Sequence, residues 1–496
     1  MPKLNLEDEL LTYDDVLLEP CYSDVEPSAP ILKTNLTQKI VLGLPIVSSP
    51  MDKVTEKEMC IAMAQNGGIG ILHRNYSPEE QVKVVKEIKR HEGYIIKRPI
   101  TVKPDMTIGD VRDLIKEHRL EFDTFPVVDE KKKIIGILTL TDYYLEKDDM
   151  TVAKRMSKCL DTITPIDSEN REIVREQLRK KKKKRLIISN KNGKLAGLIT
   201  GKDFILRDLY PDATRDSQGR LMVGAAVGVG KSEVTRAGML YKAGVDVVLV
   251  DISHGHCKNE IDTIKAIKHD CPDLQIIAGN VATEKGVEDL VAAGADCVRI
   301  GFGAGSICTT RIITGSGVPQ FAAVVRCAEK VRQINEKEGR NICAIADGGI
   351  KQYGHMGIAL AYADTVMLGN LLAGVDESPG RKVLKDGRLY KEYRGMGSMA
   401  AISERAGGGK SRYELKNSDT IIPQGVEGVV DYRGPLKNVL YQMIGAIKFS
   451  LATTGAKNLK EFRQKAVINR ISKSGSEENH PSVNMTEQPV NYTGRN

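Results

Sequence analysis

Three short apolar runs follow one another in the second half of the chain: VDVVLVDISHG (245–255), LQIIAGNVAT (274–283) and CVRIGFGAGS (297–306). The apolar residues of each run are continuous rather than alternating, and stretches of helical character separate the runs. Continuous apolar runs are typical of parallel strands that are buried on both faces. Polar or glycine residues end each run, so the pattern predicts β/α units whose functional side chains follow the strands.

Five further runs of the same kind bring the number of predicted strands to eight. They are LPIVSSPMD (44–52), GGIGILHRN (67–75), LMVGAAVG (221–228), CAIADGGI (343–350) and DTVMLGN (364–370). Eight β/α units predict an α/β fold of the TIM (β/α)8 barrel type, with its chemistry at the carboxyl ends of the strands. A doubly wound sheet is the alternative, and the lack of a Rossmann glycine fingerprint in the sequence disfavours it.

An internal repeat interrupts the series of strands. ITVKPDMTIGDVRDLI contains Pro104 and TITPIDSENREIVREQL contains Pro165, which lie 165 − 104 = 61 residues apart. Two later apolar runs end at Asp142 and Asp203, and 203 − 142 gives 61 again. Each unit reads as a strand, a helix and two further strands. The two units resemble a tandem pair of CBS domains.

The repeat divides the chain into three predicted parts. We expect the N-terminal part of the barrel at residues 1–93 and its C-terminal part at 211–496. Between them, residues 94–210 form the inserted module, with its first repeat at about 95–150 and its second at about 155–208.

Charge is concentrated in one place. The chain has 496 residues, with 73 Lys or Arg against 65 Asp or Glu, and a formal net charge of +8. Seven consecutive basic residues, Arg179 to Arg185, supply +7 of this, so the rest of the chain is close to neutral. This distribution disfavours a general nucleic-acid binder. The basic run is either a solvated helix face or a phosphate-binding patch.

Nothing in the sequence predicts export or a membrane span. No apolar run approaches the roughly 18–20 residues that cross a bilayer, and MPKLNLEDEL at the start lacks the features of a secretory signal. The nine cysteines are scattered and form no CxxC pair, which favours a reducing compartment. We therefore expect a cytoplasmic protein with no membrane partner.

Glycine-rich loops follow the later strands. GFGAGSICTT (301–310) places Cys308 on a loop where the backbone can approach a ligand, so this thiol is a candidate nucleophile; the alternative is an inert buried cysteine. The loops Asp347–Ile350 and Met367–Asn370 are candidates for phosphate binding through backbone N–H groups, or else are tight turns.

A stretch rich in glycine and charge, with little periodicity, follows YRGMGSM (393–399). In a compact enzyme such a stretch is typical of a mobile lid, and a disordered insertion is the alternative. We expect this flap to extend over about residues 386–430.

Nine motifs occur in order along the chain: LTYDDVLLEP, SSPMD, GGIGILHRN, GNV, GSICTT, IADGGI, YRGMGS, RY and PQGVEG. Together they resemble the IMP dehydrogenase / GMP reductase family over essentially the full chain. The resemblance implies a TIM-barrel enzyme, interrupted by a CBS pair. Its expected reaction is the NAD-dependent oxidation of IMP to XMP, the committed step of guanine nucleotide synthesis.

The resemblance also implies roles for four catalytic residues. Cys308 would attack C2 of IMP, a hydride would pass to NAD⁺, and water would hydrolyse the covalent thioimidate after the flap closes. Thr310 would position or activate this water, and Arg412 with Tyr413 would be the base on the flap. Because the ordinary arginine pKa is above 12, this role requires a site that disfavours the charge, or a relay through Tyr413 and Thr310.

Binding residues are implied by their positions in the matching motifs. Those for IMP are Ser49, Met51, Ser306, Asp347, Gly349, Gly369, Asn370, Tyr393, Gly395, Met396, Gly397 and Gln424. Those for the dinucleotide are Asp251, Ser253, Asn280, Arg299, Gly301 and Gly303. Two of the matches depart from the family pattern, since Asn370 replaces the usual serine and Ile252 the usual serine or threonine after Asp251.

Three further partners are implied by the resemblance. A K⁺ ion would take the carbonyl oxygens of Gly303, Gly305 and Cys308, together with Glu478, Asn479 and His480 of a neighbouring subunit. That arrangement implies a homotetramer, or an octamer formed through the CBS domains. Adenine or guanine nucleotides would bind the CBS domains.

Two rival functions stay open. GMP reductase, which deaminates GMP to IMP with NADPH, shares the cysteine loop but lacks an Arg-Tyr lid of this kind. Arg412, Tyr413 and PQGVEG therefore favour the dehydrogenase. A nucleotide-sensing regulator with an inactive barrel is the second rival, and the presence of Cys308 and Thr310 argues against it.

Overall fold

The structure is a computed structural model that describes residues 9–91, 99–117, 124–158, 162–180, 185–404, 422–483, 485–486, 489 and 491–492. Arg412 and Tyr413 lie outside these residues, as do residues 181–184 of the basic run. The chain divides into two compact units. One comprises Met1–His91, Asp212–Asp216 and Leu221–Asn496, and the other comprises Glu92–Pro211 and Ser217–Arg220.

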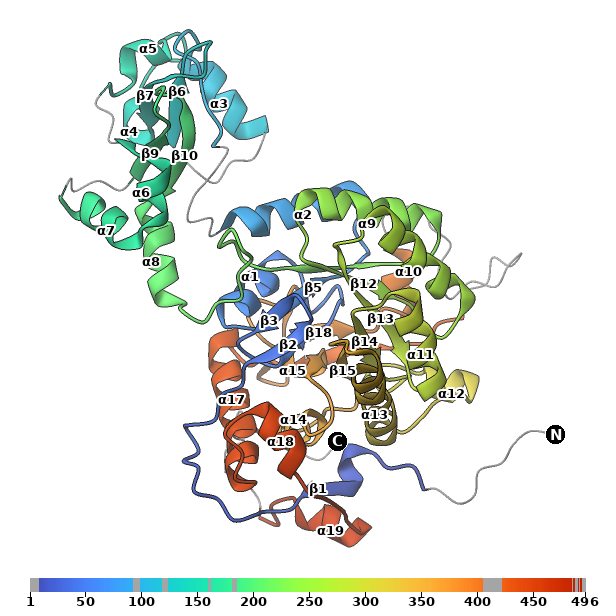
Figure 1. Cartoon of the computed structure of the whole chain (residues 1–496). Helices are drawn as coiled ribbons and strands as arrows, with labels where there is room; N and C mark the ends of the chain where they lie inside the picture. The colour runs from blue at the N-terminus through green and yellow to red at the C-terminus, as the bar shows by residue number, and fades with distance from the viewer. Residues whose placement is uncertain are drawn as a thin grey trace. The chain divides into compact units, whose positions relative to one another are not determined.

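Eight parallel strands form a closed barrel, in the order β11, β12, β13, β14, β15, β16, β4, β5 around the ring (Figure 1). Their bounds are β4 (Ile46–Ser48), β5 (Ile69–Leu72), β11 (Gly224–Val227), β12 (Val247–Asp251), β13 (Gln275–Val281), β14 (Cys297–Ile300), β15 (Cys343–Asp347) and β16 (Thr365–Leu368). Every residue of β11, β12 and β14 is buried, as continuous apolar runs require. Each of the eight apolar runs supplies one strand, so the predicted TIM barrel is confirmed.

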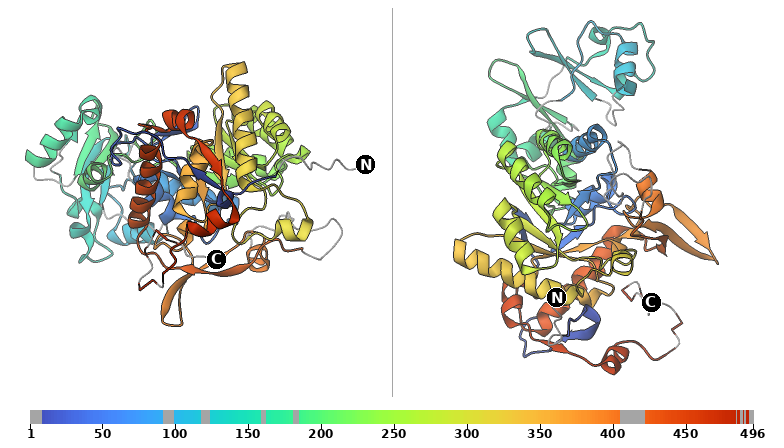
Figure 2. Two further views of the ribbon diagram at one scale, coloured as in Figure 1. Left: turned by 90° about the horizontal axis from the view of Figure 1, so that it is seen from below. Right: turned by 90° about the vertical axis from the view of Figure 1, so that its right-hand side faces the viewer.

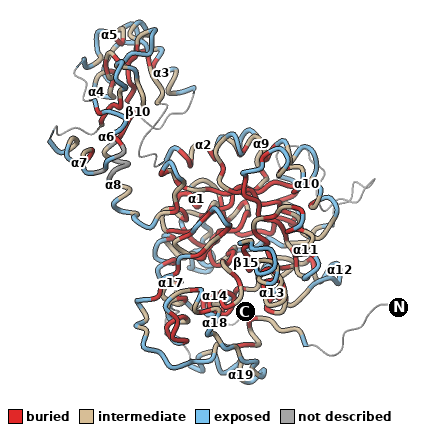
Figure 3. The backbone as a smooth tube through the Cα atoms, in the orientation of Figure 1, coloured by how far each residue is buried: buried red, intermediate tan, exposed pale blue. Residues whose placement is uncertain are grey.

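Helices surround the barrel (Figure 3), and their buried apolar residues share one core cluster with buried residues of the strands. They are α1 (Lys57–Gln65), α2 (Pro78–His91), α9 (Lys231–Ala243), α10 (Lys258–Asp270), α11 (Glu284–Ala293), α13 (Gln320–Glu338), α14 (Tyr353–Leu360) and α17 (Leu436–Thr453). Gly244 and Gly294 end α9 and α11 in the left-handed region, at φ 94° and 113°. Glycine adopts this conformation without the steric cost of a Cβ atom, so both helices stop where the next strand must begin.

A hairpin closes the amino end of the barrel. It consists of β2 (Thr34–Thr37) and β3 (Ile40–Leu42), and its Leu36 and Leu42 pack among interior side chains of the strands. The Thr34 hydroxyl donates to the carbonyl of Asp364, directly before β16, at 2.9 Å. Apolar side chains of the described residues fill this end, so ligand binding is expected at the carboxyl ends of the strands.

An antiparallel sheet lies outside the barrel (Figure 2). It consists of β17 (Lys382–Lys385), β18 (Arg388–Arg394) and β19 (Glu427–Asp431), and α16 (Met399–Ser403) follows β18. The predicted flap, at about residues 386–430, includes two of these strands. In the described part of this range, Tyr393 pairs with Gly428 and Arg394 with Glu427 across the sheet.

The inserted unit shows the internal repeat in its strands. The first pair is β6 (Thr124–Val128) and β7 (Ile134–Thr139), and the second is β9 (Arg185–Ser189) and β10 (Leu195–Thr200). Both pairs keep the offset of the sequence repeat, since 185 − 124 and 195 − 134 equal 61. Ile134, Ile187 and Leu198 form a shared apolar cluster between the pairs. The other elements are α3 (Ile108–Glu117), α4 (Leu140–Tyr143), α5 (Val152–Arg155), β8 (Thr162–Ile163), α6 (Pro165–Glu169), α7 (Arg171–Lys180) and α8 (Gly201–Leu209).

Short elements complete the larger unit. They are η1 (Tyr13–Asp15), β1 (Val16–Leu18), α12 (Thr310–Thr314), α15 (Asn370–Ala373), α18 (Leu459–Lys465), β20 (Ile468–Arg470) and α19 (Lys473–Glu478). β1 pairs with β20, so the two ends of the barrel sequence meet. Within the described residues, no helix has both the length and the apolar character needed to cross a membrane.

A buried lysine ties the barrel together where the inserted sequence leaves and returns. Lys89, near the end of α2, is 3% exposed, and its ammonium group lies 2.8 Å from Asp246 and 2.9 Å from Asp216. It also donates to the carbonyl of Leu221, before β11, at 3.0 Å. Lys89, which precedes the insertion, therefore neutralises two largely buried carboxylates that follow Pro211.

We predict that Lys89→Met destabilises the barrel by about 3–5 kcal/mol, because it leaves two buried carboxylates without a counter-charge. Chemical denaturation followed by circular dichroism measures this loss. Lys86→Met is the matched control, since Lys86 lies on the same helix and is exposed. Equal stability of the two variants would contradict the prediction.

Candidate active site

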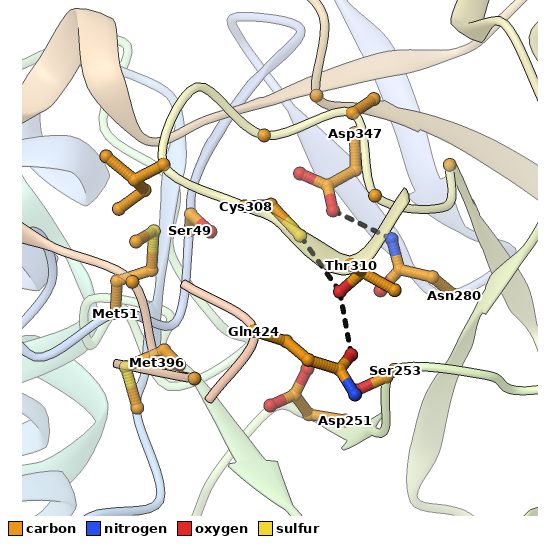
Figure 4. A pocket seen from close by; sticks show the side chains of 18 of the residues that line it. Ser49, Met51, Asp251, Ser253, Asn280, Cys308, Thr310, Asp347, Met396 and Gln424 are labelled. Carbon is orange, nitrogen blue, oxygen red and sulfur yellow. Dashed lines mark hydrogen bonds between the residues drawn. The ribbon is translucent and has the colours of Figure 1, made fainter. Parts of the chain in front are cut away.

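A cleft opens at the carboxyl ends of the barrel strands (Figure 4). Its walls come from the loops after β4, β12, β13, β14 and β15, and from the segments after β18 and before β19. The lining residues are Ser49, Pro50, Met51, Asp251, Ile252, Ser253, Asn280, Arg299, Gly301, Gly303, Ala304, Gly305, Ile307, Cys308, Thr310, Asp347, Gly348, Tyr393, Gly395, Met396, Gly397 and Gln424. The barrel thus brings together side chains that are far apart in the sequence.

Cys308 begins a chain of hydrogen bonds across one wall of the cleft. Its thiol donates to the Thr310 hydroxyl at 3.2 Å, and that hydroxyl donates to Oε1 of Gln424 at 2.9 Å (Figure 4). Backbone bonds hold the two segments together, because the Thr309 amide donates to the Gln424 carbonyl at 3.1 Å. The thiol is partly exposed to the cleft, whereas Thr310 is buried. A nucleophile and a fixed hydroxyl therefore lie side by side.

Arg299, on β14, connects the ends of β12 and β15. Its Nη1 donates to Asp251 at 2.8 Å and its Nε to Asp347 at 2.9 Å. Burial by itself lowers the pKa of Arg299, but the two carboxylates outweigh it and raise the pKa, so the guanidinium stays charged. Asn280 also donates to Asp347, at 2.9 Å. Both donors bind Oδ2 of Asp347, and this carboxylate lines the cleft.

Two methionines and a tyrosine line the opposite wall. The Tyr393 hydroxyl points to the sulfur of Met51 at 3.8 Å, and the backbone amide of Asp52 lies 3.5 Å from the sulfur of Met396. Burial raises the pKa of Tyr393, so its hydroxyl is a neutral donor. Met51 and Met396 occupy the same side of the cleft in Figure 4.

A buried ion pair holds this wall in place. Arg394 donates to Asp52 at 2.7 Å, and both side chains are at least nine-tenths buried. Asp52 follows Met51 and Arg394 follows Tyr393, so the pair joins the β4 loop to the end of β18. Sequence analysis missed this pair. Both residues occur in quoted motifs, SSPMD and YRGMGS, but no pattern pairs charges that are 342 positions apart.

Most of the sequence-predicted residues line the cleft, and four border it. Ser306 forms a hydrogen bond with Tyr393, and Asn370 begins α15. Gly369 lies against the other wall, because a Cβ there would approach the Tyr393 hydroxyl to 3.0 Å. The amide of Gly349 donates to the Ala304 carbonyl at 3.0 Å, so in this structure that amide is not turned to the cleft. Pro50, Ile252, Ala304, Ile307 and Gly348 line the cleft although they are absent from the prediction.

The residues predicted for K⁺ separate into two groups within one chain. Gly303, Gly305 and Cys308 lie on the cleft loop, whereas Glu478 ends α19, which packs against η1, and Asn479 and His480 follow it. His480 contacts the Tyr492 hydroxyl at 3.0 Å. Among the described residues, no cluster of His, Cys, Asp or Glu could hold a metal ion, so a cation here would rely on carbonyl oxygens.

Residues 10–482 match the IMP dehydrogenase / GMP reductase domain. The chain belongs to the IMP dehydrogenase / GMP reductase family. Inosine-5'-monophosphate dehydrogenase of Aquifex aeolicus is 44% identical over 489 residues, which cover 98% of each chain. That of Escherichia coli K12 is 42% identical over 494 residues, which cover 99% of each. The structure of a GMP reductase variant from Trypanosoma brucei in complex with guanosine 5'-monophosphate has a TM-score of 0.85 and 36% identity, covering 97% of this chain and 99% of that one.

The cysteines of this family member differ in their surroundings. Cys308 is partly exposed and Cys21 is exposed, whereas Cys60, Cys327 and Cys343 are buried. Burial raises the pKa of Cys327 to about 12 and raises the pKa values of Cys60 and Cys343 as well. Only the thiolate reacts with electrophiles, so these buried thiols are inert near neutral pH.

We predict that iodoacetamide at about pH 8 modifies Cys308 and Cys21 at least ten times faster than Cys60, Cys327 and Cys343. The folded protein is labelled for set times and then digested, and mass spectrometry of the peptides measures the rate at each cysteine. A Cys308→Ala variant identifies the signal of Cys308 among those of Cys21 and the partly exposed Cys257. Labelling of Cys60 at the rate of Cys308 would show that the buried thiols are not protected.

Proposed function

We propose that this chain is an IMP dehydrogenase, which oxidises IMP to XMP with NAD⁺ in the cytoplasm. The observation that carries the proposal is the Cys308–Thr310–Gln424 chain of hydrogen bonds at the carboxyl end of the barrel. It combines a nucleophile with a hydroxyl that can position water. The relatives named inosine-5'-monophosphate dehydrogenase, similar over almost their whole length, support the same reaction.

The reaction proceeds in two steps that share one covalent intermediate. The Cys308 sulfur forms a bond to C2 of the purine, and the C2–H bond breaks as a hydride leaves to reduce NAD⁺ to NADH. Water then adds to C2 of the thioimidate, the C–S bond breaks, and XMP is released with the thiol restored. The balance is IMP, NAD⁺ and water on one side, and XMP, NADH and a proton on the other.

IMP binding uses the residues between the two walls. Met396, Gly397 and Gln424 would meet the purine edge, beside Cys308. Asp347 would accept from the ribose hydroxyls through Oδ1, because Asn280 and Arg299 both donate to Oδ2. By the resemblance, Gly349 and Gly369 would bind the phosphate, to which Asn370 can also donate, Tyr393 and Gly395 would meet the purine edge, and Ser49, Met51 and Ser306 complete the pocket.

NAD⁺ would bind along the opposite wall of the cleft. That wall comprises Asp251, Ser253, Asn280, Arg299, Gly301 and Gly303. When bound, the nicotinamide supplies the hydride acceptor. Arg299 binds and orients Asp251 and Asp347, so the wall carries two acidic side chains against one guanidinium and suits a cationic ring.

Thr310 is suited to the water step because its hydroxyl hydrogen is already donated to Gln424. Its hydroxyl donates to Gln424, so its oxygen can accept from the thiol of Cys308 or from a water near C2. Arg412 and Tyr413 would remove the proton of that water. They lie outside the described residues, so this role stands on the family resemblance.

A K⁺ ion and a neighbouring subunit would complete the cysteine loop. The donor chemistry fits K⁺, because three main-chain carbonyls, of Gly303, Gly305 and Cys308, lie on one loop. The Gly305 carbonyl also accepts from the Cys308 amide at 3.1 Å, so it would be shared. Since Glu478, Asn479 and His480 belong to another part of the same chain, their carbonyls would come from a second subunit. A homotetramer, or an octamer, meets this requirement.

GMP reductase is the second candidate function. The specific observation in its favour is the similarity to the Trypanosoma brucei GMP reductase structure over 97% of this chain. Both reactions begin with a purine nucleotide beside Cys308. They differ in cofactor and product, because the reductase consumes NADPH and releases ammonia from GMP.

We predict that the purified protein produces NADH from IMP and NAD⁺, measured by absorbance at about 340 nm, and does not oxidise NADPH with GMP. Cys308→Ala should lower the turnover rate at least about 10³-fold, since no bond to C2 can form. Mass spectrometry of the wild type during turnover should find the nucleotide adduct on the Cys308 peptide. Turnover of GMP with NADPH alone would establish the reductase instead, and an active Cys308→Ala variant would refute covalent catalysis.

We further propose that the inserted unit, a tandem CBS pair, binds adenine or guanine nucleotides. The paired strands at the 61-residue offset and the shared cluster of Ile134, Ile187 and Leu198 support a two-fold arrangement of this kind. Nucleic acid is not an expected partner, because the basic run has no interleaved aromatic residues.

We predict that ATP or GTP binds the full chain in calorimetric titrations performed with saturating IMP, which occupies the barrel cleft. The resulting complex should differ in assembly state by analytical ultracentrifugation, or in rate by the NADH assay. A titration without heat for either nucleotide, confirmed by equilibrium dialysis, would contradict nucleotide binding by the inserted unit.

A further inference from the structure

A glutamate is buried behind the proposed dinucleotide wall. Glu260 lies in the first turn of α10, and its side chain is 0% exposed. Its Oε1 accepts a hydrogen bond from the backbone amide of Gly279 at 2.7 Å. Among the described residues, its Oε2 has no hydrogen-bond partner. A buried carboxyl that is only half satisfied costs stability, so its presence calls for an explanation.

The partner of Glu260 is part of the site wall. Gly279 lies near the carboxyl end of β13, directly before Asn280. The side-chain amide of Asn280 donates to Asp347 at 2.9 Å. On its other side Gly279 is packed against Arg299, because a Cβ atom at Gly279 would collide with the Arg299 carbonyl. The backbone of Gly279 is therefore held between Glu260 and Arg299.

The neighbouring loop closes over the same carboxyl. The amide of Gly255 donates to the Asn280 carbonyl at 2.7 Å, and the amide of Asn280 donates to the Ile252 carbonyl at 3.1 Å. A Cβ atom at Gly255 would lie 2.9 Å from Oε2 of Glu260, so the carboxyl fills the space beneath this loop. Glu260 thus supports the loops after β12 and β13 together.

The surroundings of Glu260 favour the neutral, protonated form of its carboxyl group. Burial is the main cause that raises the pKa of Glu260 well above its usual range, and the carboxylate of Asp251 raises it further. A protonated Glu260 still accepts the Gly279 amide at Oε1. It does so without adding a third negative charge beside Asp251 and Asp347, which share one guanidinium.

We propose that Glu260 is a positioning residue for the dinucleotide half of the site, acting through the Gly279 amide to fix Asn280. It does not touch the cleft itself, since it is absent from the lining residues and fully buried. The inference rests on the proposed function in that the wall formed by Asp251, Asn280 and Arg299 is taken to bind the dinucleotide. Asn280 also donates to Asp347, which is assigned to the IMP ribose, but Asp347 keeps the bond from Arg299 when Asn280 shifts, so the effect should fall mainly on the dinucleotide.

Four substitutions test the inference, three of them at position 260. Glu260→Gln keeps a neutral acceptor and should leave kcat and both KM values within about twofold of the wild type. Glu260→Leu removes the acceptor from a buried amide, and the KM for NAD⁺ should rise about tenfold or more while the KM for IMP changes less than about twofold. Asp262→Leu is the matched control, because Asp262 lies on the same helix and is exposed.

Glu260→Asp covers the case in which the leucine variant does not fold. Its carboxyl is one methylene shorter, so it should weaken the Gly279 bond and raise the KM for NAD⁺ without changing that for IMP. An unchanged KM for NAD⁺ in both the Asp and Leu variants would overturn the proposal, as would a glutamine variant that behaves like leucine. A wild type that turns over GMP with NADPH and not IMP with NAD⁺ would refute only the proposed function, and the same variants would then be compared by the KM for NADPH.

Discussion

The ion pairs of Arg299 are the interaction on which the site depends. Its guanidinium lies at the end of β14 and joins Asp251 at the end of β12 to Asp347 at the end of β15. All three side chains are largely buried, where an unpaired charge is costly. Each of these three charged side chains is stable in its buried position only when the barrel closes with β12, β14 and β15 in the observed register. The same register sets the direction in which the following loops leave.

Those loops supply the two halves of the cleft. The loop after β14 carries Cys308, and the segment before β19 returns Gln424 to meet it through Thr310. On the other side, the Asp52–Arg394 pair joins the β4 loop to the end of β18. Both connections join the barrel to the residues that flank the sheet of β17, β18 and β19. This sheet is thus part of the site's framework, although it lies outside the barrel.

The sequence by itself determined the barrel, the repeat and the cysteine loop. A strand that is buried on both faces needs apolar residues at successive positions, and this requirement is local to the strand. Each of the strands β4, β5 and β11 to β16 could therefore be predicted from its own apolar run. The 61-residue offset is likewise a property of the sequence alone. Most of the candidate site residues were found because each follows a predicted strand or occurs in a quoted motif.

Only the tertiary structure decided which distant residues meet. The pairing of β18 with β19, the Asp52–Arg394 ion pair and the bond from Gly279 to Glu260 had no signal in the sequence. Glu260 lies on helix α10 among several other charged residues, so the sequence does not distinguish it as a buried residue. A charged or polar side chain carries no local pattern that names its partner, because the partner is selected by closure of the barrel and by the cost of leaving a buried group unpaired.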